Sequence, residues 1–223
     1  IAESTSLRCI LYNVPSRTIT NMTAETTLRL AEIDNIVGVK EASSDLVQIT
    51  QIIDAAPSGF NVWSGNDDET FPIMCVGGYG IVSVAANIIG NQIKAMMGMV
   101  LEGDIETAAK EHRRMLPIFK ALFWVTNPIP IKYAVNRAGF DAGEPRLPLV
   151  EPDAGFKARF DAVMARNFSL SSRGTEGSRP SSSTRWLNSS QLNSRLINCW
   201  EFIFIGSNLA LLPGDAEDDL EPV

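Results

Sequence analysis

The stretch IVGVKE (residues 36–41) is a short apolar run that ends on a lysine, Lys40, and a glutamate. A run of this length between polar segments predicts a buried β-strand. Desolvating an isolated cation is costly, so such a strand has little reason to carry an ammonium group unless that group does chemistry. Burial lowers the pKa of a lysine, and a neutral amine attacks carbonyl groups to form a Schiff base. The alternative is a lysine that extends to water and has no chemical role.

Short apolar runs alternate with longer amphipathic runs on both sides of this stretch. We expect strands at residues 7–12, 36–40, 60–64 and 79–84. Helices are expected after the capping residues Thr23 and Asp45, then at residues 67–76, 105–124, 131–138 and 156–166. Strands that alternate with helices at this interval indicate βαβ units with parallel strands. The sequence therefore predicts an α/β fold.

Composition narrows the classes of function. The 223 residues are 45% hydrophobic and 20% charged, which is typical of a soluble globular protein. A net charge of −7 and the lack of a basic run argue against a nucleic-acid partner and favour a small-molecule substrate. Widely separated cysteines, Cys9, Cys75 and Cys199, favour a reducing compartment over a disulfide framework or zinc site. With no membrane-spanning run or signal-peptide pattern, we expect a cytoplasmic protein without a membrane partner.

Polar residues gather where the predicted strands end, which is where parallel α/β folds carry their function. These ends read YNVPSRT (12–18), KEAS (40–43), SGND (64–67) and IVS (81–83). Tyr12, Arg17 and Lys40 form a coherent set: a phenol for proton transfer, a guanidinium for a carboxylate and an amine for a carbonyl. Taken singly, Tyr12 is typical of a half-buried strand residue and Arg17 of a surface charge. Their shared location favours a site.

These motifs resemble the dihydrodipicolinate synthase (4-hydroxy-tetrahydrodipicolinate synthase) family of class I aldolases. The resemblance rests on YNVPSRT, on GVKEA with its Lys40 28 positions after Tyr12, on SGND and on GGYGIVSVAAN (77–87), and it covers roughly residues 7–166. It implies the second half of a (β/α)8 TIM barrel, followed by C-terminal helices. It also implies a cytoplasmic homotetramer that needs neither a metal nor an organic cofactor.

The resemblance implies a role for each candidate residue. Lys40 would form the Schiff base with pyruvate, Tyr12 would relay protons, and Arg17 would hold the carboxylate of aspartate semialdehyde. Val82 would line the pyruvate site through its backbone, beside Gly65. Relatives that act on other substrates, such as N-acetylneuraminate lyase and keto-deoxy-sugar-acid aldolases, keep the tyrosine and lysine. They generally lack arginine in the PSRT context, so Arg17 favours the synthase of the diaminopimelate route to lysine.

The chain also departs from the family pattern. Ile19 stands where many members have glycine. The first half of the barrel is missing, including the GTTGE loop whose threonine completes the proton relay and the tyrosine that members lend across a subunit interface. Because the chain also starts at Ile1, we expect a fragment of a longer enzyme. The alternatives are a sugar-acid aldolase and an inactive half-barrel that serves as a structural or interaction module.

The remaining features have simpler interpretations. Asp67, Asp68 and Glu69 suggest helix-capping acids more than a metal site. His112 lies in a charged segment and is expected to be solvated, whereas Met96, Met97 and Met99 should pack a helix face.

We divide the chain into the barrel strands and helices (1–101), a C-terminal helical region (102–166) and a tail (167–223). Ten serines in residues 169–194 predict disorder in that tail.

Overall fold

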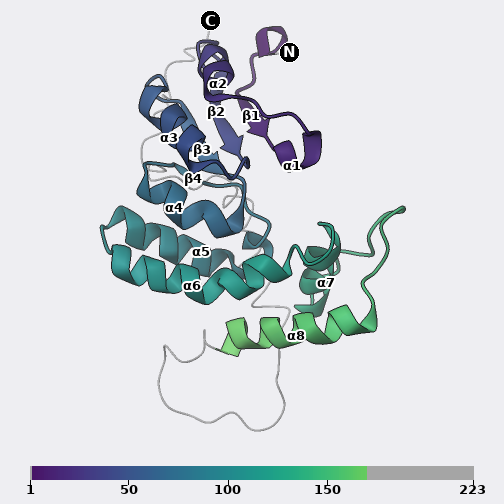
Figure 1. The fold of residues 1–223 in the computed structure, drawn as a ribbon. Helices are drawn as coiled ribbons and strands as arrows, with labels where there is room; N and C mark the ends of the chain where they lie inside the picture. Colours follow the sequence, from purple (N-terminus) through teal and green to yellow (C-terminus); the bar gives the residue numbers. More distant parts are fainter. Residues whose placement is uncertain (1, 170–223) are drawn as a thin grey trace, which may run out of the picture.

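The computed structural model describes residues 2–169, which contain one four-stranded parallel sheet (Figure 1). Its strands are β1 (Cys9–Asn13), β2 (Ile36–Glu41), β3 (Asn61–Ser64) and β4 (Gly80–Ile81). Each strand pairs in parallel with the next one along the chain, so the order in the sheet is the order in the sequence. The predicted α/β fold with parallel strands is confirmed.

The fourth strand is shorter than the predicted range of 79–84. Only Gly80 and Ile81 pair with β3, although the Val82 amide still donates to the Ser64 carbonyl at 3.0 Å. The next backbone amides turn away from the sheet and donate to a side chain, the Asp67 carboxylate. An amide that is bonded in this way is lost to the strand ladder, which explains why the strand ends early.

The helices and helical turns fall between and after the strands. They are η1 (Ala2–Ser4), α1 (Pro15–Thr18), α2 (Ala24–Leu30), α3 (Leu46–Ala55), η2 (Asp67–Glu69), α4 (Thr70–Cys75), α5 (Ala86–Leu101), α6 (Ile105–Ala121), α7 (Ile129–Arg137) and α8 (Ala154–Ser169). Thr23 Oγ1 accepts a hydrogen bond from the Thr26 amide, and Asp45 Oδ1 accepts one from the Gln48 amide. Both predicted N-caps are confirmed.

Predicted helix bounds need correction at α6, at α7 and at α8, which spans Ala154–Ser169 instead of residues 156–166. α6 ends at Ala121 instead of residue 124, and α7 begins at Ile129, before Pro130 instead of after it. Proline is tolerated in the first helical turn because its missing amide would have had no partner within the helix. Pro130 therefore lies in the first turn of a helix that the sequence pattern placed two residues later.

Side chains of the parallel strands alternate between two faces of the sheet. Val39 and Val62 are register partners, and both pack with Ile49, Ile52 and Ile73 from α3 and α4. Next along the strands, Tyr12, Lys40 and Trp63 are paired in register, so they share the opposite face. The helix-covered face thus stabilises the sheet, and the other face carries the candidate amine.

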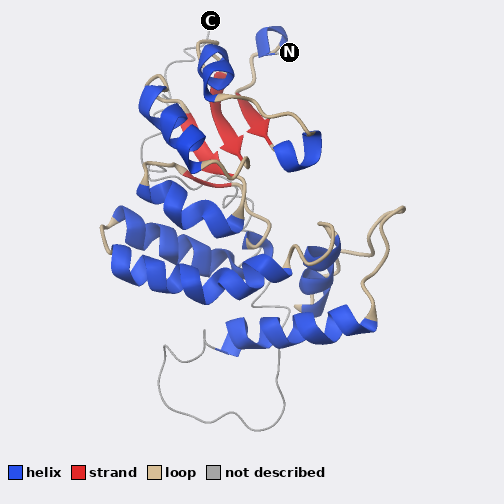
Figure 2. Cartoon of the chain, viewed as in Figure 1, coloured by secondary structure: helices blue, strands red, loops and turns tan. Residues whose placement is uncertain are grey.

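The long helices form a second core below the sheet (Figure 2). Met96 and Met97 are buried in this core and Met99 packs against it, which confirms the predicted role of the methionines. No helix within residues 2–169 is both long and apolar enough to cross a bilayer. Residues 167–169 complete α8, and the rest of the predicted tail lies outside the described residues.

His112 is not the solvated side chain that its charged neighbours suggested. Its ring stacks on Phe71, with 5.5 Å between the ring centroids, and its Nδ1 atom is buried. Burial lowers the pKa of His112 below its ordinary value. The sequence around His112 is polar, but α4 lies against this face of α6 and supplies an apolar neighbour.

Ile19 ends the short helix α1 in a left-handed conformation, with φ at 61°. Few residues other than glycine adopt this conformation readily, because a Cβ approaches the backbone too closely. The side chain is 90% exposed and therefore has little packing to offset this strain. This left-handed backbone is a physical reason for the glycine that many members of the family described above carry at this position.

We expect Ile19→Gly to raise the free energy of unfolding by roughly 1 kcal/mol, because glycine adopts this backbone conformation without the clash. Urea unfolding of the full chain measures the change. Ile19→Ala is the control: it removes the exposed side chain but keeps the Cβ, so it should leave stability within about 0.5 kcal/mol. An equal gain in both variants would show that the left-handed backbone is not the cause.

Candidate active site

Tyr12 and Lys40 lie side by side at the carboxyl ends of β1 and β2. They are register partners, and Lys40 Nζ lies over the Tyr12 ring, 4.2 Å from its centroid. Tyr12 is 54% exposed and Lys40 is half-buried. The structure therefore brings together the two residues that the sequence analysis selected for amine and phenol chemistry.

A buried carboxylate fixes the strand ends on the helix-covered face of the sheet. Glu41 follows Lys40 and is fully buried, and Asn13, which follows Tyr12, is its register partner. Asn13 Nδ2 donates to both Glu41 oxygens, at 3.0 and 3.2 Å, and the Ser43 amide donates to Oε1 at 2.8 Å. Because Tyr12 and Lys40 are the adjacent residues on the same strands, this bonding holds their backbones level.

The same network extends to the loop after α1 and to α3. Gln48 Nε2 donates to Glu41 Oε2 at 3.2 Å, and Asn21 Nδ2 donates to Gln48 Oε1 at 2.9 Å. Asn21 Oδ1 in turn accepts from Asn13 Nδ2 at 2.8 Å. Asn13, Glu41 and Gln48 are buried, and together with the exposed Asn21 they satisfy one another, as buried polar groups require. The sequence analysis did not identify this network; its only signal was a polar residue directly after each of Tyr12 and Lys40.

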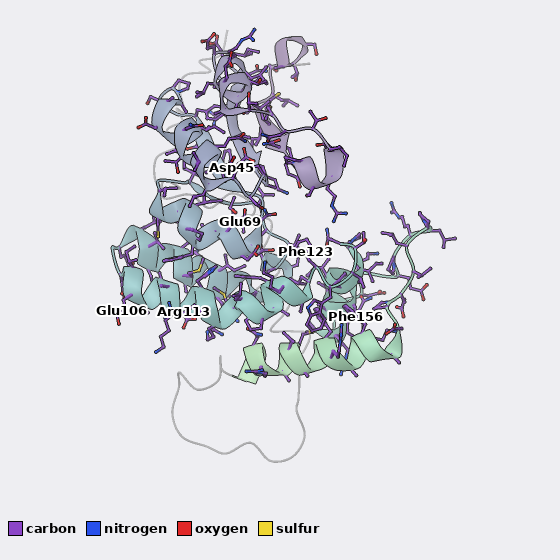
Figure 3. The ribbon with its side chains drawn as sticks, in the orientation of Figure 1. Asp45, Glu69, Glu106, Arg113, Phe123 and Phe156 are labelled. Carbon is purple, nitrogen blue, oxygen red and sulfur yellow. The ribbon has the colours of Figure 1, made fainter. Side chains whose placement is uncertain are left out.

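Gly65 and Val82 continue the row of strand ends beyond β2. The Gly65 amide donates to the Glu41 carbonyl at 2.7 Å, and the Val82 amide donates to the Ser64 carbonyl at 3.0 Å. A Cβ on Gly65 would lie 2.6 Å from the Ala42 Cβ, so only glycine permits this close approach of the backbones. Asp45, in the segment after β2, and Glu69, in the segment after β3, are labelled in Figure 3.

Arg17 is the candidate that stands apart. It lies in the last turn of α1, and its side chain is exposed. α1 follows β1 directly, so Arg17 is near the end of the same strand that carries Tyr12. The structure therefore gathers Tyr12, Lys40, Gly65 and Val82 at the strand ends and leaves Arg17 in the solvent beside them.

Asp67 is the first residue of η2, but its carboxylate bonds the segment that leads into α5. Its carboxylate accepts hydrogen bonds from the Ser83 hydroxyl and from the amides of Val84 and Ala85, which lead into α5. Burial raises the pKa of Asp67 from 3.8 to about 6, although these hydrogen bonds act in the opposite direction. Asp68 forms an ion pair with Lys120 of α6. Within residues 2–169, no group of three or more His, Cys, Asp or Glu side chains is placed to hold a metal.

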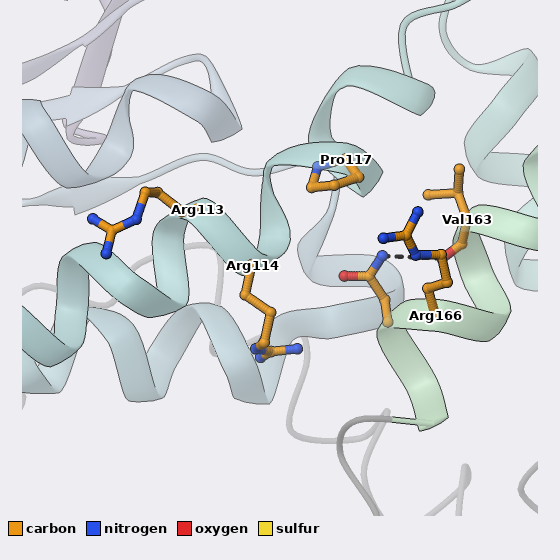
Figure 4. A pocket seen from close by; sticks show the side chains of 6 residues that line it. Arg113, Arg114, Pro117, Val163 and Arg166 are labelled. Atoms are coloured by element: carbon orange, nitrogen blue, oxygen red, sulfur yellow. Dashed lines mark hydrogen bonds between the residues drawn. The ribbon is translucent and has the colours of Figure 1, made fainter.

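A pocket of about 220 Å³ lies between α6 and α8 (Figure 4). It is lined by Arg113, Arg114, Pro117, Val163, Arg166 and Asn167. None of the five candidate residues lines this pocket. The candidate active site is therefore defined by the chemistry of the strand ends and not by this pocket.

Residues 1–166 match the sequence model of the dihydrodipicolinate synthetase family. The chain belongs to this family. It is 55% identical to the 4-hydroxy-tetrahydrodipicolinate synthase of Dehalococcoides mccartyi strain CBDB1 over 153 residues, which are 69% of this chain and 52% of that protein. It is also 55% identical to the synthase of Moorella thermoacetica over 164 residues, which are 74% of this chain and 56% of that protein.

Solved structures agree with this membership. The crystal structure of dihydrodipicolinate synthase from Thermotoga maritima superposes with a TM-score of 0.73 at 41% identity, covering 75% of this chain and 58% of that one. These neighbours assign the parallel α/β sheet of this family member to the TIM-barrel fold. The chain spans about half the length of the curated relatives it matches.

We expect Glu41→Ala to lower the free energy of unfolding by roughly 3 kcal/mol, because it removes the buried acceptor that the Asn13 side chain, the Gln48 side chain and the Ser43 amide share. Urea unfolding of the full chain measures the loss. Glu32→Ala is the matched control, since Glu32 is exposed and should change stability by less than about 0.5 kcal/mol. A Glu41 variant as stable as the control would contradict the role assigned to this network.

Proposed function

We propose that the chain supplies the Schiff-base half of a 4-hydroxy-tetrahydrodipicolinate synthase. This lyase of the class I aldolase type would condense pyruvate with L-aspartate 4-semialdehyde in the diaminopimelate route to lysine. The observation that carries the proposal is the position of Lys40 Nζ over the Tyr12 ring at two adjacent strand ends. The names of the relatives at 55% identity support the same reaction.

In the proposed reaction, the neutral amine of Lys40 attacks the ketone carbon of pyruvate, and loss of water gives an iminium. Removal of a proton from the methyl carbon gives an enamine, whose carbon attacks the aldehyde of the second substrate. The amino group of the second substrate then attacks the iminium carbon, which closes the ring and expels the Lys40 amine. Tyr12 would carry protons to and from the nitrogen and oxygen atoms that change charge in these steps, and its closeness to Lys40 Nζ supports this role.

The other candidates would bind the two carboxylates. Backbone groups of Gly65 and Val82 end the neighbouring strands, where they would line the pyruvate site. Arg17 is exposed on α1, where it would meet the carboxylate of the aldehyde substrate. A guanidinium recognises a carboxylate through two parallel hydrogen bonds. Arg17 would therefore select an aldehyde that carries a carboxylate over a sugar aldehyde that carries none.

We further propose that residues 1–101 form the second half of the barrel and residues 102–166 a C-terminal helical region, whose last helix continues to Ser169. Within residues 2–169, β1 and β4 each have a single strand neighbour, whereas a closed barrel pairs every strand on both sides. Four further βα units would pair with these two edges and cover the face that carries Tyr12 and Lys40. The complete enzyme is proposed to be a cytoplasmic homotetramer.

We expect pyruvate and borohydride to leave a stable adduct on Lys40 once the barrel is complete. Joining residues 1–166 to the first half of the Moorella thermoacetica synthase gives a protein for this test, which we call the joined barrel. Closing the barrel would remove water from around Lys40, which favours the reactive neutral amine. The chain alone should label at least about 10-fold less, because Lys40 is only half-buried there. Peptide mass spectrometry reads out both proteins.

Lys40→Arg in the joined barrel is the control, since it keeps the charge and removes the nucleophile. Adducts on Lys94 or Lys132 in place of Lys40 would overturn the assignment. Turnover by the chain alone that approaches turnover by an intact relative would instead show that the missing units are not needed.

Arg17→Ala in the joined barrel should lower kcat/KM for aspartate semialdehyde roughly 100-fold, because the substrate carboxylate loses its charged partner. Formation of the pyruvate adduct on Lys40 should stay unchanged, since the amine chemistry is intact. A coupled reductase assay measures the first quantity and borohydride trapping the second. Arg29→Ala, at an exposed position of α2, is the matched control. Equal losses in both assays would argue against a role for Arg17 in aldehyde recognition.

A further inference from the structure

Asp67 is a buried carboxylate that has no part in the proposed reaction. It is 2% exposed and lies at the start of η2, two residues after Gly65. Burying a carboxylate is costly unless it is hydrogen-bonded, so its partners show what the position is for. All three of the partners that the structure gives it lie in the segment directly after Val82.

These bonds join two neighbouring strand-end segments. One carboxylate oxygen accepts from the Ser83 hydroxyl, and the other accepts from the amides of Val84 and Ala85 at 3.3 and 3.1 Å. The Ser83 oxygen in turn accepts from the Ala86 amide at 2.8 Å. Asp67 therefore bonds, directly or through Ser83, to four consecutive residues that begin just beyond Val82.

An ordinary helix cap does not account for this arrangement. A cap residue normally precedes its own helix in the chain and stays partly solvated. Ala85 holds the capping position of α5 and has no side chain that can cap; the Ser83 hydroxyl accepts from the first helical amide, and Asp67 bonds the two residues before the helix. Its raised pKa is consistent with a carboxylate that is retained in the interior at a cost.

We propose that Asp67 is a positioning residue for the pyruvate site: it holds the backbone of Val82 against the end of β3, beside Gly65. The inference rests on the proposed function for the identity of the ligand, but the geometry is that of the chain itself. Within residues 2–169, Val82 has a single ladder bond, from its amide to the Ser64 carbonyl. Because β4 ends at Ile81 and the chain then turns out of the sheet, the Asp67 bonds fix the position of residues 83–85, which directly follow Val82.

The first test measures hydrogen exchange of backbone amides by NMR in the full chain. In Asp67→Ala we expect exchange of the Val82, Val84 and Ala85 amides to accelerate at least 10-fold, with no comparable change at Ile49 and Ile52 in α3. Asp67→Asn keeps one acceptor oxygen and should recover part of the protection. Asp68→Ala is the matched control, because it removes the neighbouring carboxylate and its ion pair with Lys120 but none of these bonds.

The second test uses the joined barrel and pyruvate trapping at Lys40. Asp67→Ala should raise the pyruvate concentration for half-maximal adduct at least 10-fold and leave the maximal adduct nearly unchanged, since the amine itself is intact. Asp67→Asn should fall between this variant and the parent protein. A uniform loss of adduct at all concentrations would indicate general damage and overturn the positioning role.

The two proposals fail separately. If the parent joined barrel forms no adduct at Lys40, the proposed function is wrong, whereas the exchange measurement still decides whether Asp67 holds Val82. If Val82 exchanges at the same rate in Asp67→Ala and the parent chain, or if Ile49 and Ile52 accelerate equally, the positioning role is wrong even when the adduct forms.

Discussion

The bond between Asn13 and Glu41 is the interaction on which the candidate site depends. It joins the last residues of β1 and β2, and each of those residues directly follows a member of the site. A buried carboxylate attracts donors strongly in a low-dielectric interior, so this pairing holds the two strand ends level in a way that apolar packing does not. The chemistry on one face of the sheet is thus set by polar groups buried on the other. The side chains of Lys40 and Tyr12 lie on the opposite face and take no part in this bonding.

The same division recurs at the next pair of strand ends. Asp67 bonds the residues that follow Val82, and Glu41 directly follows Lys40. Both carboxylates are buried, and their donors are backbone amides, side-chain amides or a hydroxyl. Neither acid has a basic side chain among the bonds that the structure gives it. Hydrogen-bond donors of fixed geometry hold a backbone more rigidly than a flexible ion pair would. In this chain, polar bonding just outside the strand ends therefore holds the residues of the candidate site in place.

Much of this could be read from local sequence, because it depends on neighbours in the chain. Thr23 and Asp45 cap the helices that they precede, and Tyr12 and Lys40 end apolar runs, so pattern alone located them. Glu41 escaped prediction because its partners come from separate elements and only the fold brings them together. Asp67 bonds a segment far along the chain, and the environment of His112 depends on α4. Such contacts leave no periodic signal in the sequence.

The order of the sheet has a consequence for how the protein forms. Each strand pairs with the strand before it in the chain. During synthesis, the pairing partner of each new strand has therefore already left the ribosome. Contacts between successive units are short in sequence, which favours fast folding over the slow search that distant strands require. A sheet built in this way can also gain or lose whole units at its edges without rethreading the chain. Duplication and fusion of βα units are therefore open routes by which genes can lengthen or divide such a barrel.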